Sequence, residues 1–157
     1  QEETFRLQKM VKGITAISFL LKQKVHIKGF SFTRYEKAWM ELSAAGADHL
    51  YGDSFVVAEH AVERIGNNVS LEFTGMDFGR EGAGSLMVCG RAPAGDNTIH
   101  VRFFDGEKED KQIIEFAGSS DYVRREFPLM PVKGKQTVTF VFMPGSCFDF
   151  ASFQFKK

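Results

Sequence analysis

Residues 137–142 (TVTFVF) and 148–155 (FDFASFQF) are two short, Phe-rich runs near the end of the chain, with Pro144-Gly145-Ser146 between them. Apolar and polar side chains alternate along each run, at the period near two that is typical of a half-buried β-strand. Pro and Gly are strong turn residues. This stretch therefore predicts two consecutive strands joined by a short loop.

The same signal recurs toward the N-terminus. Further strands are predicted at residues 14–21, 25–32, 69–73, 85–88, 98–104 and 112–116, and most of the gaps between them are rich in Gly, Asn, Asp or Pro. Strands at this spacing indicate a sandwich or barrel, and the absence of alternating long helices argues against a parallel α/β sheet. We expect an all-β protein, an antiparallel β-sandwich of the jelly-roll type. Only residues 34–45 (RYEKAWMELSAA) contain mainly helix formers, and they predict either a short helix or an irregular strand.

An internal repeat gives the domain organisation. Residues 5–32 and 127–155 both begin Phe-x-Leu, continue with Val-Lys-Gly and a Phe-bearing apolar run, and close on Phe-x-Phe. The offset is 121 residues at the Lys-Gly pair and 123 at the closing Phe-x-Phe. We therefore interpret residues 1–32 as the tail of a preceding module and residues 33–157 as one complete module.

The first residue is Gln1 and not Met, which fits a piece of a longer protein. A lone pair of strands is only marginally stable in water. It must dock on the module, pair with another chain or stay partly disordered. We expect residues 1–32 to dock along a sheet edge of the module, where they would protect that edge.

Composition excludes several partners. Lys plus Arg and Asp plus Glu each total 20, so no net charge attracts nucleic acid or an anionic membrane. No apolar run reaches the roughly 18 residues of a membrane span. Cys89 and Cys147 lie on separate strand-like runs and would pair only if their Cα atoms came within about 7 Å. Two buried free thiols are the favoured interpretation.

Several motifs resemble a known family. The segments Val69–Gly79 (VSLEFTGMDFG), Thr98–Phe104 and Thr137–Phe155 resemble the galactose-binding-like β-sandwiches, in particular the family 6 carbohydrate-binding modules. Four short sequences are similar to a C-terminal module of bacterial glycoside hydrolase family 2 enzymes, the β-galactosidase type. They are residues 51–55 (YGDSF), 65–71 (IGNNVSL), 89–91 (CGR) and 143–146 (MPGS). The resemblance covers about four-fifths of the chain and implies an accessory module of a secreted enzyme.

The resemblance also implies a structural calcium, held in part by a Glu-x-Glu pair and by an Asp of the closing strand. Here Glu41 keeps the first carboxylate, Ser43 replaces the second, and Ala151 stands at the position of the Asp. Calcium takes 6–8 oxygen ligands, so the loss of two carboxylates weakens the site. We therefore expect no calcium and no other cofactor.

The sugar site of the family lies in the loops at one end of the sandwich and uses two aromatic side chains and an Asn. The resemblance places Tyr122 at one aromatic position, Arg64 at the other, and Asp149 at the Asn. One ring platform is therefore lost, and one amide becomes a group that only accepts hydrogen bonds. Asn67 and Asn68 add polar groups in a nearby loop, although turn chemistry explains them about equally well.

Other residues have plainer interpretations. Trp39 is a sugar platform or, more often for a lone Trp beside apolar neighbours, part of the core. Arg91 and Arg102 either bind ligand groups or form ion pairs on the strands. Catalysis has little support, because the four histidines are scattered and no phosphate loop, zinc motif or nucleophile elbow is present.

The sequence is compatible with three functions. The first is a non-catalytic carbohydrate-binding module of an extracellular or cell-surface bacterial glycosidase, which would bind a glycan such as a galactoside and position the catalytic domains. The second is a structural or oligomerising module of the same enzyme with no sugar ligand. The third and least supported is an independent enzyme.

Overall fold

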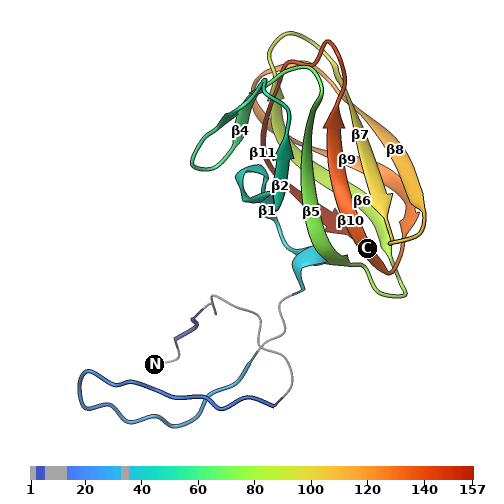
Figure 1. Cartoon of the computed structure of the whole chain (residues 1–157). Coiled ribbons are helices and arrows are strands. Elements are labelled where there is room, and N and C mark those ends of the chain that lie inside the picture. Colours follow the sequence, from blue (N-terminus) through green and yellow to red (C-terminus); the bar gives the residue numbers. More distant parts are fainter. Residues whose placement is uncertain (1–2, 6–13, 33–35) are drawn as a thin grey trace. The chain divides into compact units, whose positions relative to one another are not determined.

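The computed structural model describes residues 3–5, 14–32 and 36–157 of the chain (Figure 1). The chain divides into two compact units, Gln1–Arg34 and Tyr35–Lys157. The second unit contains all the regular strands of the described residues. Among those residues, no helix has both the length and the apolar character that a bilayer crossing needs.

The second unit is an antiparallel β-sandwich, as predicted. One sheet has the order β3-β4-β11-β6-β9, with β1 also paired to β11, and the other has the order β2-β5-β10-β7-β8. The strands of the first sheet are β1 (Leu42–Ser43), β3 (Val56–Val57), β4 (Val62–Ile65), β6 (Ala83–Ala92), β9 (Ser119–Val132) and β11 (Phe148–Lys156). Those of the second are β2 (His49–Tyr51), β5 (Val69–Asp77), β7 (Asn97–Phe104), β8 (Glu109–Phe116) and β10 (Lys135–Phe142).

Phenylalanine fills the space between the sheets. Burial alternates along the central strands, because successive side chains of a strand point to opposite faces. Edge-to-face ring pairs connect the two layers, with centroid distances such as 4.6 Å between Phe73 and Phe153 and 5.0 Å between Phe140 and Phe150. Ten phenylalanines are almost fully buried, namely Phe73, Phe78, Phe103, Phe116, Phe140, Phe142, Phe148, Phe150, Phe153 and Phe155.

Each of the two closing strands is an inner strand, β10 of the second sheet and β11 of the first. Strand β10 pairs with β5 on one side and β7 on the other, and β11 pairs with β6 and β4. The register of β11 against β6 shifts between Phe150 and Ser152, which marks a β-bulge. Six of the predicted strands correspond to β5, β6, β7, β8, β10 and β11.

The long strand β9 was not predicted. It lies at the edge of the first sheet and pairs only with β6. Its side chains are mostly exposed and it includes Pro128 and Pro131, so it lacks the apolar alternation of an inner strand. Proline is tolerated in such a strand because an edge leaves N–H groups unpaired.

Residues 36–46 combine both structures that the sequence left open. They form two single-turn 3₁₀ helices, η1 (Lys37–Trp39) and η2 (Ala44–Gly46), around the short strand β1. Trp39 packs against the core beside Phe78, with 5.7 Å between ring centroids, which agrees with the core interpretation. Residues 34 and 35 of the predicted segment lie outside the described residues.

The strands predicted at residues 14–21 and 25–32 are wrong as regular strands. Both runs lack strand structure, although the rings of Phe19 and Phe30 lie 5.2 Å apart and so link the two runs. The apolar side chains of these runs are exposed. Alternation supplies a strand only where neighbouring strands accept its hydrogen bonds and cover its apolar face. The repeat residues 6–13 lie outside the described residues.

The two cysteines do not pair. Cys89 on β6 and Cys147 in front of β11 are both free. The prediction of free thiols is therefore confirmed. The prediction that both are buried is wrong, because both are only half-buried. Cys89 is turned away from the core, because the alternate residues of β6 supply the core contacts.

Candidate functional site

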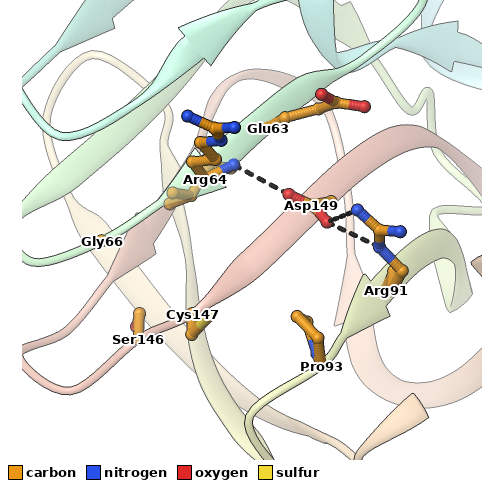
Figure 2. A pocket seen from close by; sticks show the side chains of 9 residues that line it. Glu63, Arg64, Gly66, Arg91, Pro93, Ser146, Cys147 and Asp149 are labelled. Carbon is orange, nitrogen blue, oxygen red and sulfur yellow. Dashed lines mark hydrogen bonds and ion pairs between the residues drawn. The ribbon is translucent and has the colours of Figure 1, made fainter. Parts of the chain in front are cut away.

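A cleft of about 400 Å³ lies at one end of the sandwich, where β4 and β6 end and β11 begins (Figure 2). These strands are neighbours in the sheet but are distant in sequence, so the fold brings three loops together. The lining residues are Glu63, Arg64, Ile65, Gly66, Arg91, Pro93, Ser146, Cys147 and Asp149. Two of the five predicted sugar-site residues, Arg64 and Asp149, are therefore part of one cleft.

Asp149 is the buried centre of the cleft. The residue is only 4% exposed. One carboxylate oxygen, Oδ1, accepts the backbone N–H of Arg64 at 2.7 Å, and the other, Oδ2, accepts Nε and Nη2 of Arg91 at 2.7 and 2.6 Å (Figure 2). A buried carboxylate needs such partners, because desolvation of an unpaired charge is costly. Asp149 therefore orients its neighbours and has little free capacity for a ligand.

Arg91 is held by this ion pair. The carboxylate of Asp149 raises the pKa of the guanidinium above its ordinary value, through a hydrogen bond and direct charge attraction. The guanidinium is partly exposed and also lies over the ring of Tyr122, 5.3 Å from its centroid. This arrangement is a cation–π contact. Of the two interpretations of Arg91 from sequence, the ion pair is confirmed.

The backbone of Arg64 is in the left-handed region, with φ at 54°. The register between β4 and β11 explains it: Ile65 pairs with Phe148 and Val62 with Phe150, so β4 carries one extra residue there. Such a bulge lets the N–H of Arg64 turn away from the ladder and donate to Asp149. Left-handed backbone is uncommon for a side chain of this kind and is concentrated at functional sites.

Tyr122 lies beside the cleft on β9, so it belongs to a strand and not to an end loop of the sandwich, where the resemblance places the sugar site. Its hydroxyl donates to Oε1 of Glu63 at 3.1 Å, and 39% of the residue is exposed. Burial, together with the hydrogen bond and the nearby carboxylates, raises the pKa of Tyr122 to about 12. Tyr122, Glu63, Arg91 and Asp149 thus form one connected network across four strands.

Asn67 and Asn68 shape the neighbouring loop. Oδ1 of Asn67 accepts the backbone N–H of Gly145 at 2.7 Å, which ties the β4–β5 turn to the β10–β11 loop. Asn68 has φ at 56°, a left-handed conformation that Asn tolerates. Both side chains are exposed but do not line the cleft. Turn chemistry explains these contacts, and a role in ligand binding stays a prediction.

Sequence reasoning did not find Asn97, which positions the third loop. Its amide Nδ2 donates to the carbonyl of Cys147 at 3.2 Å, and its Oδ1 accepts the N–H of Cys147 at 3.0 Å. Asn97 is buried at the start of β7. The sequence shows only an Asn directly before the strand predicted at residues 98–104, and its partner Cys147 is 50 residues away.

The chemistry of this cleft suits a neutral, hydroxyl-rich ligand. Arg64 and Arg91 offer N–H donors, Glu63 offers an acceptor, and the exposed Pro93 supplies apolar surface. Ligand sites commonly combine apolar surface with a few oriented polar groups. The two cations and two carboxylates balance, so the cleft does not select a strongly charged ligand.

Comparison with solved structures places this geometry among known folds. A family 6 carbohydrate-binding module from Clostridium stercorarium, solved with cellobiose, matches with a TM-score of 0.67 and 21% identity, covering 76% of this chain and 95% of that one. A family 6 module from Clostridium cellulolyticum, solved with xylose, matches with a TM-score of 0.63 and 21% identity, covering 76% and 98%. The sandwich has the fold of the family 6 carbohydrate-binding modules.

This carbohydrate-binding-module fold also occurs inside a larger enzyme. A glycoside hydrolase family 43 arabinoxylan arabinofuranohydrolase from Bacillus subtilis, solved with cellotetraose, matches with a TM-score of 0.61 and 20% identity. The match covers 76% of this chain and 27% of that one. No protein-family model matches the sequence, and no curated protein matches it either.

The position expected for the calcium of this fold does not suit the ion. Oε1 of Glu41 accepts the Ser152 hydroxyl and the Arg124 guanidinium, each at 2.7 Å, and these two contacts lower the pKa of Glu41. The Ser43 hydroxyl accepts the N–H of Ala45. In the described part of the chain, no three His, Cys, Asp or Glu side chains form a metal cluster. The absence of calcium in the protein itself stays a prediction.

Proposed function

We propose that residues 36–157 form a non-catalytic carbohydrate-binding module. The observation that carries the proposal is the cleft itself, where Asp149 presets two arginines beside the half-exposed ring of Tyr122. Sugars present hydroxyls around an apolar C–H face. A site for them therefore needs fixed donors and acceptors next to an apolar or aromatic surface.

In this proposal the two outermost residues contact the sugar. The ring of Tyr122 offers the apolar surface, and the guanidinium of Arg64, an exposed residue that lines the cleft, donates to hydroxyls. Asp149 acts indirectly by orienting Arg64 and Arg91, and Asn67 and Asn68 hold the rim. Arg64 stands at the position of a second aromatic platform. Binding at this cleft therefore depends more on hydrogen bonds than binding between two rings, which the resemblance implies, would.

The parent protein is the finer part of the proposal. The sequence resemblance supports a bacterial, extracellular glycoside hydrolase of family 2, the β-galactosidase type, with its catalytic domains elsewhere in the polypeptide. The Bacillus subtilis match supports a place for this fold within a longer glycosidase chain. The module would then hold the enzyme on a glycan, of which a galactoside is one candidate, and hydrolyse nothing itself.

A second function is favoured by one feature of the cleft. Both oxygens of Asp149 and the hydroxyl of Tyr122 are already engaged within the protein. A closed network of this kind also suits a structural module that stabilises or assembles the parent enzyme without a sugar. That function predicts a parent enzyme that loses stability or assembly, and not glycan affinity, when the module is removed.

Titration calorimetry separates the two functions. The chain is titrated with lactose and other galactosides, cello-oligosaccharides, xylo-oligosaccharides and β-1,3-glucan oligosaccharides. We expect saturable binding of at least one of them, and its loss in Tyr122→Ala and Arg64→Ala. Matched controls are Phe104→Ala and Arg102→Ala, an exposed aromatic and a second β-strand arginine outside the cleft. Absence of binding at millimolar sugar would favour the structural function.

An activity assay tests the non-catalytic part. We expect the isolated chain to release no product from aryl galactosides. Glycoside hydrolysis needs two carboxyl groups that flank the scissile bond. Both oxygens of Asp149, the buried carboxylate of the cleft, already accept hydrogen bonds from the two arginines. Turnover that Glu63→Gln and Asp149→Asn abolish would replace this proposal with an enzyme.

A further inference from the structure

Residues 14–32 expose a regular apolar pattern. Seven side chains are between 44% and 62% exposed, namely Ile17, Phe19, Leu21, Val25, Ile27, Phe30 and Phe32. An isolated apolar side chain on a surface is ordinary, but a contiguous set marks an interaction site. The segment therefore needs a partner, and the repeat within this chain indicates which one.

The first run corresponds to β10 residue by residue. At the repeat offset of 121, Ile17, Phe19 and Leu21 stand at the positions of three core residues of β10. These core residues, Val138, Phe140 and Phe142, are fully buried. The alternate positions of β10, Thr137, Thr139 and Val141, are half-buried and correspond to Ala16, Ser18 and Leu20 of the run.

The second run corresponds to β11, including its irregularity. At the offset of 123, its four apolar residues Val25, Ile27, Phe30 and Phe32 stand at the positions of Phe148, Phe150, Phe153 and Phe155. Those four phenylalanines are at most 1% exposed. The apolar phase slips by one residue at Lys28-Gly29, at the positions where the register of β11 shifts between Phe150 and Ser152.

The shared phase slip distinguishes a true repeat from two ordinary amphipathic strands. A one-residue slip moves every following side chain to the other face of a sheet. Two unrelated amphipathic strands have no reason to share it at the same place. A bulge accommodates the extra residue, and glycine is favoured there. The run at residues 25–32 is therefore built for the same bulged strand as β11.

The two places that these runs match are internal. Strand β10 has a partner on each side, and β11 pairs with β4 on one side and β6 on the other. The inner faces of both strands are covered by the opposite sheet. A sheet edge offers hydrogen bonds on one side only, so it satisfies neither run completely.

We propose that residues 14–32 are the two closing strands of a second sandwich of this fold, whose other strands lie N-terminal to them in the parent polypeptide. Residues 14–21 take the place of β10 between two strands of one sheet, and residues 25–32 take the place of β11 in the other. The partner is thus a sandwich body with an apolar interior and two open strand places. This inference is independent of sugar binding.

A fused chain made from this sequence alone tests the proposal. A copy of residues 36–132 is placed directly before Lys12 of the chain, so that residues 14–32 follow the copy as β10 and β11 follow the original. Hydrogen exchange is then measured on peptides from residues 14–32, which occur once. We expect their amides to exchange freely in the unfused chain and at least about 100-fold more slowly in the fused chain.

Two variants keep the result interpretable. Phe19→Ser with Phe30→Ser removes the central core contacts and should abolish the protection of residues 14–32, while residues 135–157 stay protected as the internal control. Leu21→Phe, Val25→Phe and Ile27→Phe restore the core volumes of the original strands. They should rescue protection if the copied body rejects the smaller side chains.

Three results would overturn the proposal. The first is free exchange of residues 14–32 in the fused chain even with the three phenylalanines restored. The second is protection of residues 14–32 in the unfused monomer, which would mean docking on the module of the same chain. The third is protection that rises with concentration together with dimer formation, which would make a second copy of this chain the partner.

Discussion

Residues 14–32 and residues 137–155 share a sequence pattern but differ in structure. Both consist of two Phe-bearing apolar runs around a short turn. In residues 137–155 these runs are β10 and β11, with their phenylalanines buried between the sheets. In residues 14–32 the equivalent side chains are exposed and no regular strand forms. The pattern specifies which face is apolar, whereas neighbouring strands decide whether a strand exists.

The turns of the two regions also differ. Residues 143–147 form the longer loop, whose end lines the cleft through Ser146 and Cys147. The equivalent connection at residues 22–24 is two residues shorter. His26 stands at the position of Asp149, the buried carboxylate of the cleft. Only one of the two regions therefore carries the residues that build the candidate site.

The largest expected contrast is in the core. Phe153→Ala should lower the free energy of unfolding of the module by about 3–5 kcal/mol, because the lost ring leaves a cavity. Its counterpart Phe30→Ala should leave that free energy unchanged, since Phe30 is exposed. Urea denaturation followed by circular dichroism measures both. Equal losses in the two variants would mean that the segment is part of the core of the module.

A smaller contrast is expected at the cleft. Asp149→Ala leaves the N–H of Arg64 and the guanidinium of Arg91 without their acceptor. We expect a loss of about 2 kcal/mol, in the range for hydrogen bonds to a charged group. His26→Ala, the matched change in the other region, should have no effect. A stable Asp149→Ala variant with unchanged sugar binding would contradict the positioning role of Asp149.

Removing residues 1–34 should change little in the module. Residues 36–157 contain the whole buried core of the described chain and all residues of the cleft. The thermal midpoint and the sugar affinity of the truncated chain should therefore equal those of the full chain. Scanning calorimetry measures the first quantity and titration calorimetry the second. A marked fall in the thermal midpoint would show that the N-terminal segment docks on the module.

The smallest effect concerns an ionisation that only the cleft region possesses. The pKa of Tyr122 is about 12 in the folded protein, above the ordinary value of about 10. Its neutral form therefore contributes stability that is complete below about pH 10 and is lost as the pH rises through 12. Glu63→Gln removes the carboxylate acceptor and should lower this pKa. A spectrophotometric titration measures this pKa, with Tyr122→Phe as the blank. An unchanged pKa of Tyr122 in Glu63→Gln would contradict the network.

Much of the fold follows from the sequence, because six strands carry apolar side chains at alternate positions, five of them inner strands and one, β8, an edge strand. The remainder depends on tertiary context. Strand β9 has a polar, proline-containing pattern that is compatible with an edge, and its 14 residues owe their structure to pairing with β6. The two-residue strands β1 and β3 are too short to show a period. The strand prediction for residues 14–32 failed for the opposite reason: the apolar alternation is present, but no neighbouring strands pair with these residues in the described chain.

The candidate site was predictable only in part. The resemblance pointed to Arg64 and Asp149, and the structure brings both to the same cleft. It did not indicate that the carboxylate of Asp149 would accept hydrogen bonds from Arg64 and Arg91. These contacts depend on a bulge in β4 and on the pairing of strands whose residues are 58 positions apart in sequence. The sequence gives no reason to single out Glu63 among the other carboxylates, because its partner Tyr122 comes from the distant strand β9.

The most direct test of the carbohydrate-binding claim is a nuclear magnetic resonance titration of the labelled chain with cellobiose, xylose and lactose. The account predicts saturable shifts that cluster at residues 63–66, 91–93 and 146–149 and at Tyr122, with residues 14–32 unaffected. A complete absence of shifts at millimolar sugar, or a cluster on strands away from this cleft, would contradict it.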